Sequence, residues 1–144
     1  MVFIDLKTQK NLLESSINNR LQKVMDHGAY IMGPEINELE KKLEEFSGSK
    51  NCITVASGTD ALLISLMAIG LQPGEEVITT PFTWVSTVEV ITLLGGIPVF
   101  ADIEPDTCNI DAAQLKDLIT DKTRAIIPVS LFGQPADMDV INYI

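Results

Sequence analysis

The sequence predicts an α/β fold of three layers, in which a mostly parallel sheet lies between helices on both faces. After Gly48, short apolar runs alternate with segments of helical periodicity. The apolar runs do not alternate with polar residues, which is typical of strands buried on both faces. The chain has 144 residues, 46% of them hydrophobic, so it can bury the core of one domain.

Residues 1–48 are predicted to form a helical segment that precedes this domain. Apolar residues recur at helical spacing up to Gly28, which suits a left-handed helix end. Residues 30–33 read as a short extended link, and Pro34 is placed to open a second helix. The apolar stripes of the two helices are Leu13, Ile17, Leu21 and Val24, then Ile36, Leu39, Leu43 and Phe46.

Residues 49–144 are predicted to be the first part of the α/β domain. The apolar runs place strands at 52–56, 76–80, 98–101 and 124–129. The intervening patterns place helices at 60–69, 83–94 and 111–119, the last with an Asp cap. Residues 138–144 read as the first turns of another helix. Because four strands would leave a sheet edge open, we interpret the chain as the N-terminal part of a longer protein.

Three loops follow predicted strands and should therefore meet at one edge of the sheet, where ligands of such folds bind. They are residues 57–60, 81–84 and 130–137. In the first loop, Ser57-Gly58-Thr59 joins a strand to a helix start, which directs free N–H groups and the helix dipole at one point. This predicts a site for a phosphate-bearing cofactor, with an ordinary capped helix start as the alternative. The loop matches neither the Gly-x-x-x-x-Gly-Lys nor the Gly-x-Gly-x-x-Gly nucleotide motif.

The second loop carries Trp84, the single tryptophan of the chain. An indole placed at the start of the next helix, at the same sheet edge as Thr59, can offer a flat face to a heteroaromatic ring. The alternative is a tryptophan packed in the core or at a subunit contact.

Charge and composition argue against several classes of partner. The chain has a net charge of −10 and no cluster of basic residues, so nucleic acid is not an expected partner. Its apolar runs are too short to span a membrane. The N-terminus has no secretory pattern. Neither the lone His27 nor the two cysteines, Cys52 and Cys108, give a metal-binding spacing, so we predict no metal site. A buried free thiol at Cys52 would suit a cytoplasmic protein.

Seven segments in register give the chain a resemblance to the DegT-type sugar-nucleotide aminotransferases. These are pyridoxal phosphate enzymes of fold type I, the aspartate aminotransferase superfamily. The matching residues are Phe3-Ile4-Asp5-Leu6, Tyr30-Ile31-Met32-Gly33-Pro34-Glu35, Ser57-Gly58-Thr59-Asp60-Ala61-Leu62, Pro73-Gly74-Glu75-Glu76-Val77-Ile78, Phe82-Thr83-Trp84, Val99-Phe100-Ala101-Asp102-Ile103-Glu104-Pro105 and Leu131-Phe132-Gly133-Gln134-Pro135-Ala136-Asp137-Met138-Asp139.

The resemblance implies a set of site residues. Positions corresponding to Gly58, Thr59 and Asp60 hold the cofactor phosphate, and the one corresponding to Trp84 stacks on the pyridine ring. It further implies that Gly28 and Tyr30 approach the nucleotide-sugar substrate, and that Gln134 lies in an active-site loop.

The resemblance also implies a reaction, in which an amino group moves from glutamate to a keto-sugar nucleotide in surface-polysaccharide or amino-sugar biosynthesis. The full-length enzymes of this family are expected to be homodimers. Many relatives have His where this chain has Ser130, which resembles the branch acting on UDP-3-keto-N-acetylglucosaminuronate-type sugars.

One required group has no counterpart in the sequence. The family's Schiff-base lysine follows a late strand, and the eight lysines of this chain lie on predicted helix faces or near helix ends. The 144-residue chain alone is therefore predicted to be inactive. Two alternatives stay open: a non-catalytic truncated or regulatory family member, and a pyridoxal phosphate sugar dehydratase of the same fold.

Overall fold

The computed structural model describes residues 3–144, which divide into two compact units. The first unit ends at Thr54, and the second is Val55–Ile144. The functional division into a segment 1–48 and a domain 49–144 stays a prediction.

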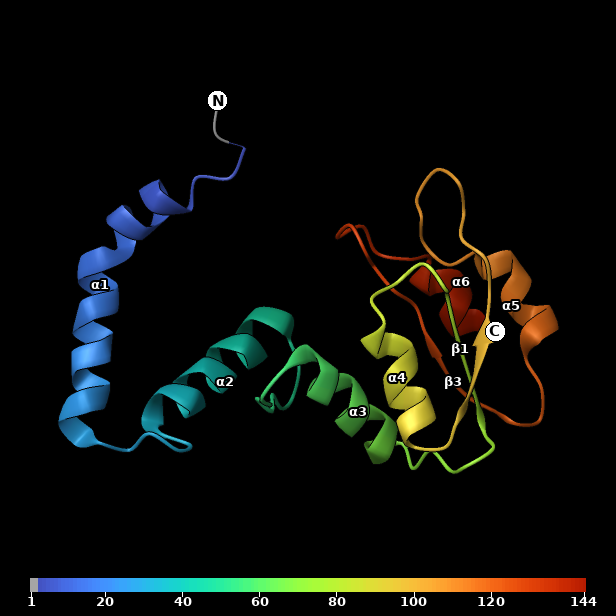
Figure 1. Ribbon diagram of the computed structural model, residues 1–144, viewed down its shortest axis with the longest axis horizontal. Helices are drawn as coiled ribbons and strands as arrows, with labels where there is room; N and C mark the ends of the chain where they lie inside the picture. The colour runs from blue at the N-terminus through green and yellow to red at the C-terminus, as the bar shows by residue number, and fades with distance from the viewer. Residues whose placement is uncertain (1–2) are drawn as a thin grey trace. The chain divides into compact units, whose positions relative to one another are not determined.

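The first helix, α1 (Leu6–His27), begins and ends at capping residues (Figure 1). The Asp5 carboxylate accepts a hydrogen bond from the Thr8 N–H at 2.9 Å, which satisfies one free donor of the first turn. Gly28 has φ +66° and donates its N–H to the Val24 carbonyl. The left-handed end predicted at Gly28 is therefore confirmed, and the helix begins earlier than the apolar stripe alone suggested.

The second helix, α2 (Pro34–Ser47), begins at the predicted proline. Gly33 precedes it in a bend so tight that a Cβ there would lie 2.4 Å from the Ala29 carbonyl oxygen. His27 Nε2 lies 3.1 Å from Glu35 Oε1 across the same bend. This hydrogen bond lowers the pKa of the Glu35 carboxyl below its ordinary value.

Residues 52–56 do not form the predicted strand, and that prediction is wrong. The Thr54 N–H and hydroxyl both donate to the Glu40 carboxylate at 2.9 Å, and the Cys52 N–H donates to the Glu44 carboxylate at 3.1 Å. Backbone donors that a sheet would need are thus taken by side chains of α2. Ile53 is 79% exposed, and Cys52 is a half-buried free thiol instead of a fully buried one.

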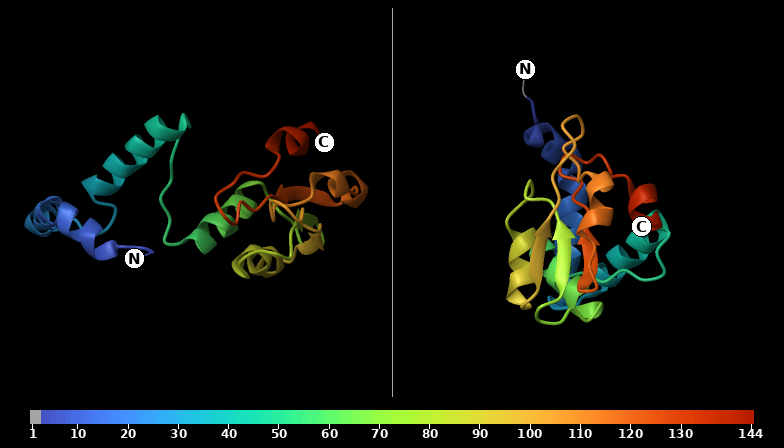
Figure 2. Two further views of the ribbon diagram at one scale, coloured as in Figure 1. Left: turned by 90° about the horizontal axis from the view of Figure 1, so that it is seen from above. Right: turned by 90° about the vertical axis from the view of Figure 1, so that its right-hand side faces the viewer.

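The second unit is a three-layer α/β arrangement around a parallel sheet, as predicted. Its strands β1 (Glu76–Thr79), β2 (Ile97–Phe100) and β3 (Thr123–Ile127) follow the order β2-β1-β3. Figure 2 shows α4 on one side of the strands and α5 and α6 on the other. The helices of this unit are α3 (Gly58–Ala68), α4 (Ser86–Leu93), α5 (Ala112–Leu118) and α6 (Met138–Tyr143).

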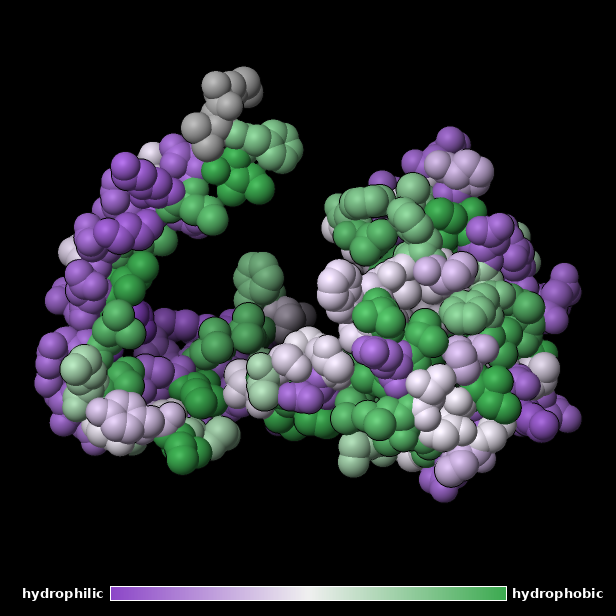
Figure 3. All heavy atoms as spheres, in the orientation of Figure 1, coloured by the Kyte–Doolittle hydropathy of each residue, from purple (hydrophilic) through white to green (hydrophobic). Residues whose placement is uncertain are grey.

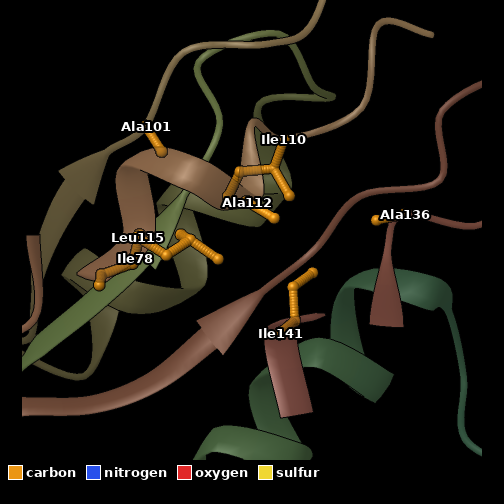
Figure 4. Packing of buried hydrophobic residues seen from close by; sticks show 7 residues of the cluster. All are labelled: Ile78, Ala101, Ile110, Ala112, Leu115, Ala136 and Ile141. Carbon is orange, nitrogen blue, oxygen red and sulfur yellow. The ribbon is translucent and has the colours of Figure 1, made fainter. Parts of the chain in front are cut away.

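Two hydrophobic cores cover the two faces of the sheet, because neighbouring residues of β1 point to opposite sides. Val77 packs with Leu66 of α3 and with Val90 and Ile91 of α4. Ile78 belongs to the other cluster, which includes Leu115 of α5 and Ile141 of α6 (Figure 4). Apolar strands with helices on both faces are what the sequence pattern predicted.

Apolar side chains of the first unit reach the surface (Figure 3). Among residues 3–144, no helix is both long and apolar enough to cross a membrane. The exposed apolar side chains on α1 and α2 include Leu12, Leu13, Ile17, Leu21, Met25 and Phe46.

We expect the 144-residue chain to self-associate in solution, because burying these side chains between molecules is favourable. Light scattering at increasing concentration should give a mass that rises above that of the monomer. The double variant Ile17→Gln, Leu21→Gln should move the mass back toward the monomer. A sharp monomer at every concentration would contradict this expectation.

Candidate functional site

A cavity of about 500 Å³ opens at the carboxyl edge of the sheet within the second unit. Residues from three parts of the sequence line it: the start of α3, the segment after β1 together with the first turn of α4, and the end of β3 with the loop after it. We call it the edge cavity. Its lining residues are Gly58, Thr59, Leu62, Thr83, Trp84, Ser86, Thr87, Ile127, Pro128, Val129 and Leu131.

The start of α3 gives the edge cavity its hydrogen-bond donors. Ser57 caps the helix, since its hydroxyl accepts from the Asp60 N–H at 3.1 Å and its carbonyl accepts from the Ala61 N–H. Within residues 3–144, the N–H groups of Gly58 and Thr59 have no protein acceptor. Two free donors and the positive end of an eleven-residue helix therefore lie at the cavity wall, an arrangement suited to an anion.

The end of β1 is buried and hydrogen-bonded to β3, and the chain continues from it to Trp84. Thr79 and Thr80 are fully buried, and the Thr79 hydroxyl donates to the Ile127 carbonyl at 3.1 Å, which joins β1 to the end of β3 that lines the cavity. Trp84 lies in the bend before α4, not in the helix as predicted, because α4 begins only at Ser86. Trp84 is 74% exposed, so its indole is accessible to a ligand.

Hydroxyl groups extend the polar part of the cavity wall. The side chains of Thr83 and Thr87 are 3.0 Å apart and hydrogen-bonded, and Ser86 and Thr87 are buried. The sequence pattern did not indicate Ser86, Thr87 or residues 127–129 as site residues. The only available signal was their position next to loops at the expected sheet edge.

The structure brings some of the predicted site residues together and leaves others apart. Gly58, Thr59 and Trp84 share the edge cavity. Asp60 instead lines a neighbouring groove with residues of α3 and α4, among them Glu89. Gln134 is exposed and lies outside the cavity lining, although Leu131 of the same loop belongs to it.

The two residues expected near the substrate, Gly28 and Tyr30, belong to the first unit. Gly28 closes α1, and Tyr30 is exposed in the bend that follows, where its N–H donates to the Gly28 carbonyl at 3.0 Å. The roles of all seven residues stay predictions.

The groups that line the edge cavity are suited to binding a ligand. The cavity offers N–H and hydroxyl donors on one wall and an open indole on another, but no lysine, arginine or histidine lines it. Among residues 3–144 there is also no cluster of three His, Cys, Asp or Glu side chains that could hold a metal ion. Fold and site together define an α/β protein with a parallel sheet and a donor-lined cavity at the carboxyl ends of its strands, where ligands of such folds bind.

The chain belongs to the DegT/DnrJ/EryC1/StrS aminotransferase family, whose model matches residues 11–144. It is 54% identical over 142 residues to a UDP-2-acetamido-2-deoxy-3-oxo-D-glucuronate aminotransferase of Pseudomonas aeruginosa, a match that covers 99% of this chain and 40% of that protein. It is 44% identical over 138 residues to a pleiotropic regulatory protein of Geobacillus stearothermophilus, a match that covers 96% of this chain and 37% of that protein.

A solved relative has the same fold over most of this chain. The crystal structure of NtdA from Bacillus subtilis with bound cofactor PMP superposes with a TM-score of 0.87 at 36% identity, covering 90% of this chain and 30% of that one. The chain therefore spans about 40% or less of the length of these relatives.

Proposed function

We propose that this chain is the N-terminal part of a pyridoxal phosphate-dependent sugar aminotransferase and forms part of its cofactor pocket. The observation that carries the proposal is the shared position of the α3 N-terminus and Trp84 in one cavity, in a chain of an aminotransferase family. The bound PMP of the Bacillus subtilis relative supports the choice of cofactor.

The residues of the edge cavity fit this cofactor. The free N–H groups of Gly58 and Thr59 and the Thr59 hydroxyl would hold the phosphate, and Trp84 would flank the ring. When bound, the cofactor supplies an electron sink for transferring an amino group. The described residues contribute orientation: donors fix the phosphate, and the buried threonines at the end of β1 fix the wall that carries Trp84.

For the substrate, we propose a UDP-linked 3-keto-N-acetylglucosaminuronate-type sugar, with glutamate as the amino donor. The 54% identity to the Pseudomonas aeruginosa enzyme supports this choice. Full-length protein given this sugar and glutamate should form 2-oxoglutarate in equal amount to the aminated sugar. Loss of the sugar hydroxyl without amination would instead identify a dehydratase.

A second candidate function is regulation without catalysis, in a homodimer that binds the cofactor or the nucleotide sugar. It is supported by the 44% identity to a pleiotropic regulatory protein. A full-length protein that binds pyridoxal phosphate but turns over no sugar would favour this candidate.

Substitutions at Thr59 and Trp84 should weaken cofactor retention for different physical reasons. A hydroxyl-to-phosphate hydrogen bond contributes about 1.5–3 kcal/mol, so Thr59→Ala should loosen binding by roughly 10- to 100-fold. Trp84→Ala removes the contact between the two rings, which contributes about 0.5–1.5 kcal/mol in addition to the free energy of burying apolar surface. This variant should also shift the cofactor absorbance band and slow turnover. Equilibrium dialysis of the full-length protein measures both constants.

Two control variants sharpen this test. Trp84→Phe keeps an aromatic face and should recover most of the loss. Thr92→Ala removes a threonine hydroxyl that bonds within α4, outside the edge cavity, and should leave retention unchanged. If Thr59→Ala and Trp84→Ala retain pyridoxal phosphate as tightly as the parent, the edge cavity is not its site.

A further inference from the structure

The loop after β3, residues 130–136, forms one wall of the edge cavity but lies outside every helix and strand. Leu131 is its contribution to the lining. A loop of this kind needs anchors if it is to hold a side chain at a binding site, since fixing each residue costs conformational entropy. The structure supplies two such anchors.

The first anchor is aromatic. The rings of Phe132 and Phe82 lie 6.3 Å apart between centroids at an angle of 57°, which is within the range of favourable tilted pairs. Phe82 belongs to the segment that carries Trp84, so this contact joins two walls of the edge cavity. Both rings are exposed.

The second anchor is a buried hydrogen bond from Asn109, which is only 5% exposed. Its Nδ2 donates to the Pro135 carbonyl at 3.1 Å, across 26 positions of sequence. The next residue, Ala136, is buried in the core cluster with Leu115 and Ile141, so the loop enters the core beside this bond.

Asn109 is itself held in place by its own loop. Its carbonyl accepts from the Glu104 N–H at 2.9 Å, and its N–H donates to the Thr107 hydroxyl at 3.2 Å. Cys108 adopts φ +58°, a left-handed conformation that reverses the chain just before Asn109, and Ile103 pairs with Ile110 across the base of the loop. The donor is therefore fixed before it meets Pro135.

We propose that Asn109 is a positioning residue: its bond to Pro135 holds residues 130–136 against the sheet edge and so sets Leu131 in the wall of the edge cavity. Asn109 is not among the residues that line the cavity, so it acts only through the loop. The consequence for cofactor binding rests on the function proposed above, whereas the anchoring of the loop does not.

The test is Asn109→Asp in the full-length protein, because aspartate keeps the shape but replaces the donor with an acceptor facing the Pro135 carbonyl. Asn142→Asp, the same chemical change at an exposed residue of α6, is the matched control. Hydrogen exchange measured on peptides should show residues 130–136 exchanging about 2- to 10-fold faster in Asn109→Asp, as expected for one lost hydrogen bond. Peptides from β1 and β2 should be unchanged in both variants.

Cofactor retention gives the second readout. Asn109→Asp should release pyridoxal phosphate faster than Asn142→Asp does, with a smaller effect than Trp84→Ala. Unchanged exchange in residues 130–136, or an equal rise throughout the sheet, would overturn the positioning role. Another outcome is that Asn109→Asp exchanges faster in the loop and still retains the cofactor, while Thr59→Ala loses it. That result would overturn the link between the loop anchor and the edge cavity. If Thr59→Ala and Trp84→Ala also retain the cofactor, the proposed function fails and the anchoring is decided by exchange alone.

Discussion

The 144-residue chain should catalyse no transamination and form no stoichiometric covalent adduct with pyridoxal phosphate at any single lysine. Transamination would need a lysine amine beside the bound cofactor to hold it, while the cofactor would supply the electron sink. The two lysines of the second unit are Lys116 on α5 and Lys122 before β3. Both are exposed, and neither lines the edge cavity.

Borohydride reduction in the presence of pyridoxal phosphate, followed by peptide mass spectrometry, measures the adduct directly. We expect weak labelling scattered over exposed lysines. The double variant Lys116→Arg, Lys122→Arg should lose the labelling at these two positions and leave the labelling of the other lysines unchanged. Stoichiometric labelling of a single lysine together with turnover would show that the chain holds a catalytic amine and would refute the prediction.

Leu115→Ala should destabilise the second unit by about 2–5 kcal/mol, the range for a large-to-small change at a fully buried site. Leu115 has no exposed surface and packs in the cluster of Ile78, Ile110 and Ile141, so its removal leaves a cavity between α5 and the sheet. Because domains are stable by only about 5–15 kcal/mol, this change should remove a large part of the total.

Urea unfolding followed by circular dichroism checks this value at one fixed protein concentration, since self-association would raise the apparent stability. Leu93→Ala is the matched control: Leu93 belongs to the same unit but is 72% exposed, so its loss should change stability by about 0.5 kcal/mol or less. Equal midpoints for the Leu115 and Leu93 variants would show that the cluster around Leu115 does not stabilise the fold.

The sequence was sufficient to predict features that depend on residues close together in the chain. The end of α1 at Gly28, the start of α2 at Pro34 and the Asp111 cap of α5 follow from local hydrogen bonds and backbone preferences, and all three are observed. The α/β class followed from the alternation of apolar runs and helical patterns. The meeting of Gly58, Thr59 and Trp84 at one sheet edge was also predicted and is observed, although the strand at 52–56 from which the position of Gly58 and Thr59 was predicted does not form.

The tertiary structure decided the features that depend on partners distant in the sequence. Residues 52–56 have the composition of a strand, but carboxylates of α2 accept hydrogen bonds from the N–H groups of Cys52 and Thr54. The local sequence pattern gives no sign of these hydrogen bonds. The strand order β2-β1-β3, the inclusion of Ser86 and Thr87 in the cavity wall, and the bond from Asn109 to Pro135 likewise join separate segments. Periodicity reports which side of an element is apolar, whereas the choice of neighbour is made by packing and hydrogen bonding in the folded chain.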